Sequence, residues 1–113
     1  MAYALEKLVD QIVLTDISKK ALKRSKYNIY IPRYKKWSRK ISLQIEGKDK
    51  NISYDAIVIA SPPDTHLNLI KKNINKSKIF LIEKPICEPK KKTINQFDKI
   101  INTYKNKIFL CGY

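Results

Sequence analysis

Two short runs of consecutive apolar residues, 56–60 and 79–82, stand out along the chain. Both are rich in β-branched or aromatic side chains and have the length of a strand that is buried on both faces. Between them, Leu67, Ile70 and Ile74 recur at the spacing of one helix face. Two buried strands joined by a crossover helix form a β-α-β unit, in which the strands are parallel. The pattern therefore predicts an α/β fold built on a parallel sheet.

The first apolar run stops at residues 61–64, which read Ser-Pro-Pro-Asp. Two prolines cannot donate hydrogen bonds to a sheet, so the strand has to end there. An Asp or Thr directly before an amphipathic run is typical of a helix N-cap. We therefore expect Asp64 or Thr65 to open the crossover helix.

Further elements are predicted on both sides of this unit. Helical spacing of apolar residues marks some segments, and continuous or alternating apolar runs mark others as strands. A turn is predicted at residues 46–49, where Gly47 is flanked by charged residues. The expected helices are residues 2–9, 17–26 and 89–104, and the expected further strands are residues 11–16, 29–31, 41–45 and 107–111.

Two motifs in the central unit resemble a known family. The stretch 55–66, DAIVIASPPDTH, is followed after one helix by Glu83-Lys84-Pro85. Both motifs and their separation are similar to the nucleotide-binding domain of the Gfo/Idh/MocA oxidoreductases, NAD(P)-dependent enzymes that act mostly on sugars, inositols and related polyols. The resemblance implies a Rossmann-like parallel sheet with helices on both faces, and a single partial dinucleotide-binding domain over residues 1–113.

The resemblance also implies cofactor contacts at the end of the first buried strand. Ala60, Ser61 and Pro62 would touch the cofactor through their backbone and small side chains, because open α/β sheets bind ligands at the carboxyl ends of their strands. His66 would also contact the cofactor. The alternative for His66 is that a histidine in the first turn of a helix bonds nearby backbone groups, and both interpretations stay open.

A second group of implied contacts follows the second buried strand. Glu83 would contact the nicotinamide ribose or carboxamide region, and Pro85 would fix the backbone beside it. Lys84 would contact the cofactor and act as the catalytic residue, since a partly desolvated ammonium can donate to or orient an alkoxide while hydride moves. The alternative is an ordinary charge pair at the end of a strand.

Asp16 closes the strand predicted at residues 11–16. In a Rossmann unit the acid at the end of the second strand accepts hydrogen bonds from both hydroxyls of the adenine ribose. Asp16 would equally serve as the cap of the next helix, and the two roles are compatible. An acid here favours NAD, whereas Lys19 and Lys20 could meet the 2'-phosphate of NADP, so the cofactor is NAD or NADP.

The 113 residues contain only two glycines, Gly47 and Gly112, and neither follows a first strand. A dinucleotide-binding domain begins with a central strand and a G-x-G-x-x-G turn that lets the backbone approach the pyrophosphate. We therefore expect an incomplete domain without its first strand, its Gly-rich loop and a substrate domain. Such a chain would be inactive by itself, and the strands at 11–16 and 56–60 would each expose a hydrophobic edge or have to pair in a nonstandard way.

Charge suggests a second function. The net charge is +14, and most of the excess lies between Lys19 and Lys50, interleaved with aromatic residues. Basic stretches with aromatic residues can bind single-stranded nucleic acid by stacking and phosphate contact. A genome rich in A and T, whose codons favour Lys, Ile and Asn, explains the same composition. The leading function is therefore the one that the resemblance implies, a partial NAD(P)-binding domain of an oxidoreductase. Nucleic-acid binding is the alternative.

Several classes of protein are disfavoured. No apolar run approaches the roughly 20 residues needed to span a membrane, and the N-terminus does not resemble a signal peptide. Cys87 and Cys111 lack metal-ligand spacing and are expected to be free thiols. We expect a cytoplasmic protein with no metal and no membrane partner. Its partners would be a nicotinamide dinucleotide and, only with a further domain, a sugar-like substrate.

Overall fold

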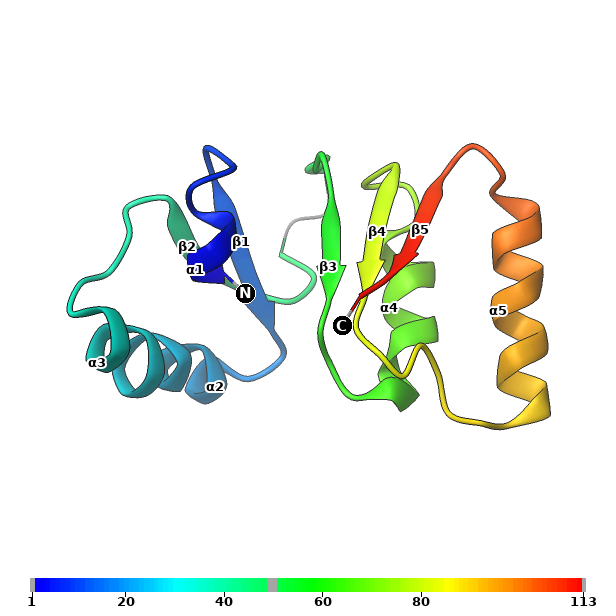
Figure 1. Cartoon of the computed structure of the whole chain (residues 1–113), viewed down its shortest axis with the longest axis horizontal. Helices are drawn as coiled ribbons and strands as arrows, with labels where there is room; N and C mark the ends of the chain where they lie inside the picture. Colours follow the sequence, from blue (N-terminus) through cyan, green and yellow to red (C-terminus); the bar gives the residue numbers. More distant parts are fainter. Residues whose placement is uncertain (1, 49–50, 113) are drawn as a thin grey trace. The chain divides into compact units, whose positions relative to one another are not determined.

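The computed structural model describes residues 2–48 and 51–112, which divide between two compact units, Met1–Lys50 and Asn51–Tyr113. We call them the first and the second unit (Figure 1). The described strands form a two-stranded sheet in the first unit and a three-stranded sheet in the second, and every strand pair is parallel. The predicted α/β class with parallel strands is confirmed, although two small sheets replace the one expected.

The first unit contains a parallel strand pair and an irregular helix. β1 and β2 pair along their whole length, which confirms the strands predicted at residues 11–16 and 41–45. α1 is shorter than the predicted helix 2–9. Gly47 turns the chain after β2 with a φ of 84°, as the predicted turn requires, and the last residue of that turn lies outside the described ranges. The elements are α1 (Ala2–Leu5), β1 (Ile12–Asp16), α2 (Lys19–Arg24), the π-helical segment η1 (Ser25–Tyr30), α3 (Ile31–Tyr34) and β2 (Ile41–Ile45).

The edge strand predicted at residues 29–31 is wrong, because this segment is helical. α2, η1 and α3 follow one another without a break, and the run ends at Lys35, which has a left-handed backbone with a φ of 63°. The π-helical segment ends at Tyr30, two residues before Pro32, whose missing N–H would cost a regular α-helix a backbone hydrogen bond. Tyr30 is 8% exposed. Its burial outweighs the local strand preference of the isoleucines beside it.

Aromatic rings pack together in the first unit. Tyr3 stacks on Tyr34 with ring centroids 3.8 Å apart and an interplanar angle of 6°. Tyr30 contacts Tyr34 at 4.9 Å and meets Trp37 edge to face at 5.0 Å. The Lys26 ammonium lies 4.9 Å from the centroid of Trp37, in the geometry of a cation–π contact. These rings form the aromatic cluster of the first unit.

Polar contacts join this cluster to the N-terminal segment. The Tyr30 hydroxyl donates to Glu6 Oε2 at 2.9 Å, and Lys40 Nζ donates to the carbonyls of Glu6 and Val9, both at 2.9 Å. Burial, reinforced by the Glu6 carboxylate, raises the pKa of Tyr30 to about 12. Hydrogen bonds from Ser38 and Tyr30 lower the pKa of the Glu6 carboxyl. The cluster therefore contains a neutral tyrosine that bonds an ionised glutamate.

The second unit has the predicted β-α-β arrangement, extended by another helix and strand. β3 is shorter than the apolar run 56–60, and β5 confirms the strand predicted at residues 107–111. The crossover begins as a single 3₁₀ turn at Pro63, and neither Asp64 nor Thr65 supplies a side-chain cap. The elements are β3 (Ile57–Ile59), the 3₁₀ turn η2 (Pro63–Thr65), α4 (His66–Asn73), β4 (Ile79–Ile82), α5 (Lys91–Thr103) and β5 (Ile108–Cys111), with strand order β3-β4-β5.

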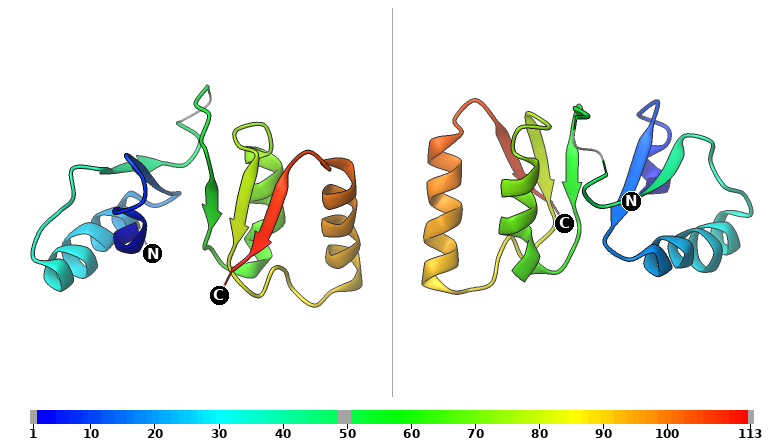
Figure 2. Two further views of the ribbon diagram at one scale, coloured as in Figure 1. Left: turned by 45° about the horizontal axis from the view of Figure 1, so that its top comes forward. Right: turned by 180° about the vertical axis from the view of Figure 1, so that it is seen from behind.

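A continuous apolar core holds the second unit together. Phe80 and Ile82 of β4 are completely buried, and they join side chains from α4, such as Ile70, and from α5, such as Phe97. Both helices therefore pack against the face of the sheet that carries Phe80 and Ile82 (Figure 2). Burying a side chain of this size stabilises the fold by about 1.5–3 kcal/mol. Within this unit the described helices cover that one face.

Candidate functional site

The three strands of the second unit end at the same level. Ile59, Ile82 and Cys111 are aligned partners in the sheet. The pairing continues one residue further, because the N–H of Glu83 donates to the Ile59 carbonyl at 2.9 Å and the N–H of Gly112 donates to the Ile82 carbonyl at 2.8 Å. The residues that follow each strand thus share one edge of the sheet. In open α/β sheets this carboxyl edge is the ligand-binding edge.

The turn 60–62 after β3 is held by hydroxyl groups. Thr65 Oγ1 donates to the Pro62 carbonyl at 2.7 Å and lies 2.6 Å from Ser61 Oγ. Since the one hydroxyl proton of Thr65 goes to a carbonyl, the Ser61 hydroxyl is the donor in the second bond. Ser61 is half-buried, whereas Ala60 and Pro62 are exposed at the edge. Hydrogen bonds of the Ser61 and Thr65 hydroxyls thus hold the turn, while Ala60 and Pro62 stay exposed beside the sheet.

His66 lies behind this turn as the first residue of α4 and is 1% exposed. Its Nε2 is 2.7 Å from the carbonyl oxygen of Ser61, and its Nδ1 is 3.0 Å from that of Ile86. These contacts match the alternative prediction for His66, in which its ring bonds nearby backbone groups. Direct contact between His66 and a cofactor stays a prediction.

Glu83, Lys84 and Pro85 follow β4 at the same edge. Glu83 is half-buried, and Lys84 and Pro85 are exposed. Lys84 was expected to be partly desolvated, but the described residues leave it exposed. The motif nevertheless lies beside the end of β3, through the hydrogen bond from Glu83 to Ile59.

Asp16 ends β1 in the first unit, so its surroundings are described within that unit alone. Its Oδ1 accepts the Ser18 N–H at 2.7 Å, and the Ser18 hydroxyl accepts the Ala21 N–H at 3.2 Å. Ser18 is therefore the N-cap of α2, and the expected capping role of Asp16 is wrong. Asp16 instead closes the turn that leads into the helix. Among the described residues, its Oδ2 has no hydrogen-bond partner.

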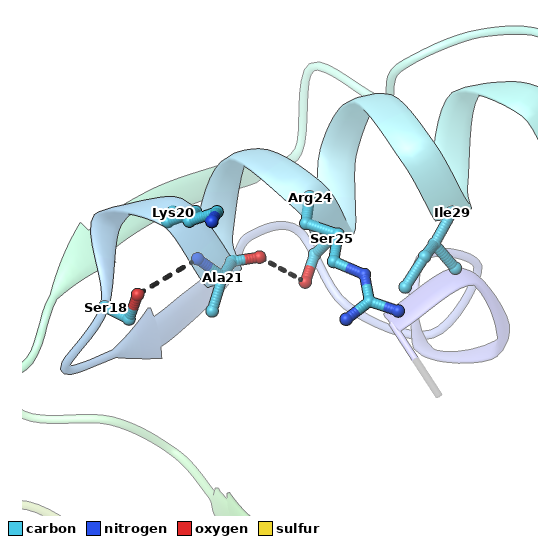
Figure 3. Close-up of a pocket in the computed structure, with 6 residues that line it drawn as sticks. All are labelled: Ser18, Lys20, Ala21, Arg24, Ser25 and Ile29. Carbon is cyan, nitrogen blue, oxygen red and sulfur yellow. Dashed lines mark hydrogen bonds between the residues drawn. The ribbon is translucent and has the colours of Figure 1, made fainter.

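A shallow pocket of about 460 Å³ lies along α2 and η1, beginning two residues after Asp16 (Figure 3). Two of its lining side chains, Lys20 and Arg24, are cationic. Lys20 was a candidate from the sequence alone, whereas Arg24 was not. The signal for Arg24 was its position four residues after Lys20, on the same helix face. The pocket is lined by Ser18, Lys20, Ala21, Arg24, Ser25 and Ile29.

No group of three or more His, Cys, Asp or Glu side chains within residues 2–48 and 51–112 could hold a metal ion. None of the helices in these ranges is long and apolar enough to cross a membrane. Cys87 is a buried free thiol and Cys111 an exposed one, as expected.

Comparison with known proteins identifies the family. A family model described as "Oxidoreductase family, NAD-binding Rossmann fold" matches residues 4–111. No curated protein sequence matches the chain. Among solved structures, the chain resembles the apo scyllo-inositol dehydrogenase from Lactobacillus casei with a TM-score of 0.61 and 23% identity, over 88% of this chain and 27% of that chain. The likeness supports the Rossmann-like fold, and the family model covers nearly the whole sequence, so the chain belongs to the Gfo/Idh/MocA oxidoreductase family.

Proposed function

We propose that the chain is the nicotinamide-binding part of an NAD(P)-dependent oxidoreductase that acts on a sugar or polyol. One observation carries this proposal: the aligned ends of β3, β4 and β5 gather the 60–62 turn, the Glu83-Lys84-Pro85 motif and Gly112 at one edge. Under this proposal, residues 1–113 form one partial dinucleotide-binding domain. The sugar-type substrate is suggested by the family and by the inositol dehydrogenase neighbour.

The residues at this edge suit the nicotinamide end of a dinucleotide. Ser61 and Glu83 are half-buried polar side chains, and Ala60, Pro62 and Pro85 present small exposed groups beside them. A polar edge of this kind can bond a ribose or a carboxamide while the small residues allow a flat ring to approach. In our proposal Ala60, Ser61, Pro62, His66, Glu83, Lys84 and Pro85 are the cofactor-binding residues, with His66 acting from behind the turn.

Lys84 is proposed as the catalytic residue. When bound, the nicotinamide supplies the hydride acceptor or donor. The Lys84 side chain would hold the substrate oxygen by a hydrogen bond. As the neutral amine it would take the carbinol proton when hydride leaves the substrate, and as the ammonium it would return a proton when hydride is added to the carbonyl. Because Lys84 is exposed in the second unit, a bound substrate would have to provide the desolvation that strengthens this contact.

Asp16 is proposed to bind the adenine ribose. Its Oδ2 would accept the ribose hydroxyls while Oδ1 keeps the Ser18 N–H. The pocket with Lys20 and Arg24 starts two residues later, and its two cations would suit the additional phosphate of NADP. NAD and NADP therefore both remain candidates, and a comparison of their affinities decides between them.

For the 113 residues by themselves we propose cofactor binding without catalysis. They contain no Gly-rich phosphate turn, so binding should be weak. We place the chain in the cytoplasm, where its two free thiols would stay reduced. Nucleic-acid binding is the weaker alternative, because the rings of Tyr3, Tyr30 and Tyr34 pack on one another and would have to separate to stack on bases.

The test is a fluorescence titration of the purified, folded chain with NADH and with NADPH. We expect saturable binding with a Kd below about 1 mM, which corresponds to about 4 kcal/mol. Asp16→Ala should weaken binding by about tenfold, since it removes hydrogen bonds to a charged group. Arg24→Ala should weaken NADPH more than NADH if the pocket takes the 2'-phosphate.

Matched controls are available on the same chain. Asp10→Ala removes an exposed acid in the first unit, and Lys78→Ala removes an exposed lysine at the opposite end of β4 from Lys84. Both should bind as the unaltered chain does. The absence of binding up to millimolar nucleotide, from a chain shown to be folded by circular dichroism, would contradict the proposal.

A further inference from the structure

His66 is the one histidine of the sequence and one of the most deeply buried side chains in the described residues. A polar ring in such a position is costly unless its nitrogens are hydrogen-bonded. Each nitrogen lies within hydrogen-bond distance of a carbonyl oxygen: Nε2 is 2.7 Å from that of Ser61, and Nδ1 is 3.0 Å from that of Ile86. The ring thus contacts the backbone of two separate segments, one after β3 and one after β4.

The chemistry of the ring makes at least one of these contacts a true donor bond. Carbonyl oxygens only accept, so a ring nitrogen can bond them only through an N–H. A neutral imidazole carries one N–H and a protonated one carries two. The ring therefore donates to one carbonyl in its neutral form and to both in its cationic form. The shorter distance, 2.7 Å, marks Ser61 as the tighter partner.

The two contacts matter because of what lies between the anchored points. At the start of the 83–86 segment, the Glu83 N–H is bonded to the Ile59 carbonyl at 2.9 Å. At its end, the Ile86 carbonyl lies 3.0 Å from His66 Nδ1 and accepts a hydrogen bond from it when that nitrogen carries a proton. Lys84 and Pro85 lie between these anchors and are exposed. The segment is thus fastened to β3 at one end and to the first turn of α4 at the other.

We propose that His66 is a positioning residue that holds the 83–86 segment against the 60–62 turn and thereby sets the backbone from which Lys84 extends. The use of this geometry for the nicotinamide rests on the function proposed above. The bridge itself does not, because it is a contact between the ring and two backbone carbonyls. The two ideas can therefore fail separately.

A spectroscopic measurement tests the bridge directly. In the ¹⁵N-labelled chain, the His66 ring should show at least one N–H proton that exchanges slowly with water, since the ring is buried and donates to a carbonyl. The contact with the 83–86 segment requires the Nδ1–H to be among the protected protons, because Nδ1 faces the Ile86 carbonyl. A folded chain without a protected Nδ1–H would overturn the proposal.

Two variants and a control extend the test to the backbone. His66→Leu keeps a bulky apolar group but removes the donor, and it should speed amide exchange at Thr65 and Glu83 by about 3- to 10-fold relative to the amides of β4. His66→Gln retains one donor and should restore part of this protection. Ile74→Ala opens the core beyond the other end of α4 without removing a hydrogen bond. It should change all of these amides alike.

The binding titration then separates the bridge from the proposed function. If the bridge positions the cofactor edge, His66→Leu weakens NADH binding several-fold and His66→Gln restores part of it, whereas Ile74→Ala has little effect while the chain is folded. If the unaltered chain binds no nucleotide, the proposed function fails and the exchange pattern still decides on the bridge. Equal exchange ratios for His66→Leu and Ile74→Ala would refute the bridge.

Discussion

The two units of the chain are held together in different ways. In the second unit, Ile70, Phe80 and Ile82 are completely buried in one apolar core. In the first unit, the aromatic cluster is partly open, with Tyr3 37% exposed, and a hydrogen bond joins Tyr30 to Glu6. An apolar core of aligned strands and helices is visible in the sequence as runs and helical spacing. A cluster that depends on ring stacking and a buried hydroxyl leaves no such pattern.

The largest expected effect is in the core of the second unit. Phe80→Ala should lower the free energy of unfolding by about 3–5 kcal/mol, because it leaves a cavity among fully buried neighbours. The matched change in the first unit, Leu43→Ala at a half-buried strand position, should cost distinctly less. Urea unfolding followed by circular dichroism measures both.

Trp37 fluorescence provides a second signal for the same unfolding experiment. It is the only tryptophan of the sequence and lies in the aromatic cluster, so its fluorescence reports the first unit. The contrast between the units predicts that Phe80→Ala moves the transition seen by circular dichroism more than the one seen by Trp37. Equal shifts in both signals would contradict the expected difference between the two units and would show that they unfold in one cooperative transition.

The same contrast explains which elements could be predicted. The strands at residues 12–16, 41–45 and 79–82 were visible because their apolar residues run or alternate with a strand's period. The segment 29–31 was mistaken for a strand because Ile29 and Ile31 precede a proline. Its helix depends on Tyr30, whose burial follows from partners elsewhere in the unit. Tertiary contacts of this kind are not encoded in local spacing.

The candidate site divides in the same way. Topology alone predicts that residues after parallel strands share an edge, so the placement of Ser61 and Glu83 could be anticipated. The bonds of the His66 ring could not, because its partner Ile86 lies 20 residues away along the chain. The Thr65 hydroxyl likewise bonds the carbonyl of Pro62 and not a helix N–H. Sequence patterns thus predicted the shared edge of the sheet but not the hydrogen-bond partners of the residues at that edge.

The contribution of the Tyr30 hydroxyl to the stability of the first unit can be tested by varying the pH. The pKa of Tyr30 is raised to about 12 in the folded chain, above about 10 for an unfolded tyrosine. The unfolded state therefore loses this proton first as the pH rises. The stabilisation is complete below pH 10 and is lost as the pH approaches 12. We therefore expect the unfolding transition followed by Trp37 fluorescence to move to lower urea concentration between pH 10 and pH 12.

Lysines also titrate at high pH, so the measurement needs a matched variant. Tyr30→Phe keeps the ring of the cluster and removes only the hydroxyl that donates to Glu6. It should be less stable at pH 8, and the difference from the unaltered chain should shrink between pH 10 and 12. A difference that stays constant with pH would mean that the hydroxyl does not contribute through its proton.

The smallest effects come from two backbone positions of the first unit that share a positive φ but carry different residues. Lys35 has a φ of 63° and Gly47 a φ of 84°, a region that glycine enters freely and other residues enter at a cost of about 1 kcal/mol. Lys35→Gly should therefore stabilise the first unit by up to about 1 kcal/mol, because it removes the strain where α3 ends. Gly47→Ala should destabilise it by a similar amount, since a Cβ there meets nothing within 4 Å and only the backbone strain counts. Urea unfolding followed by Trp37 fluorescence measures both, and the same sign for the two would contradict the backbone explanation.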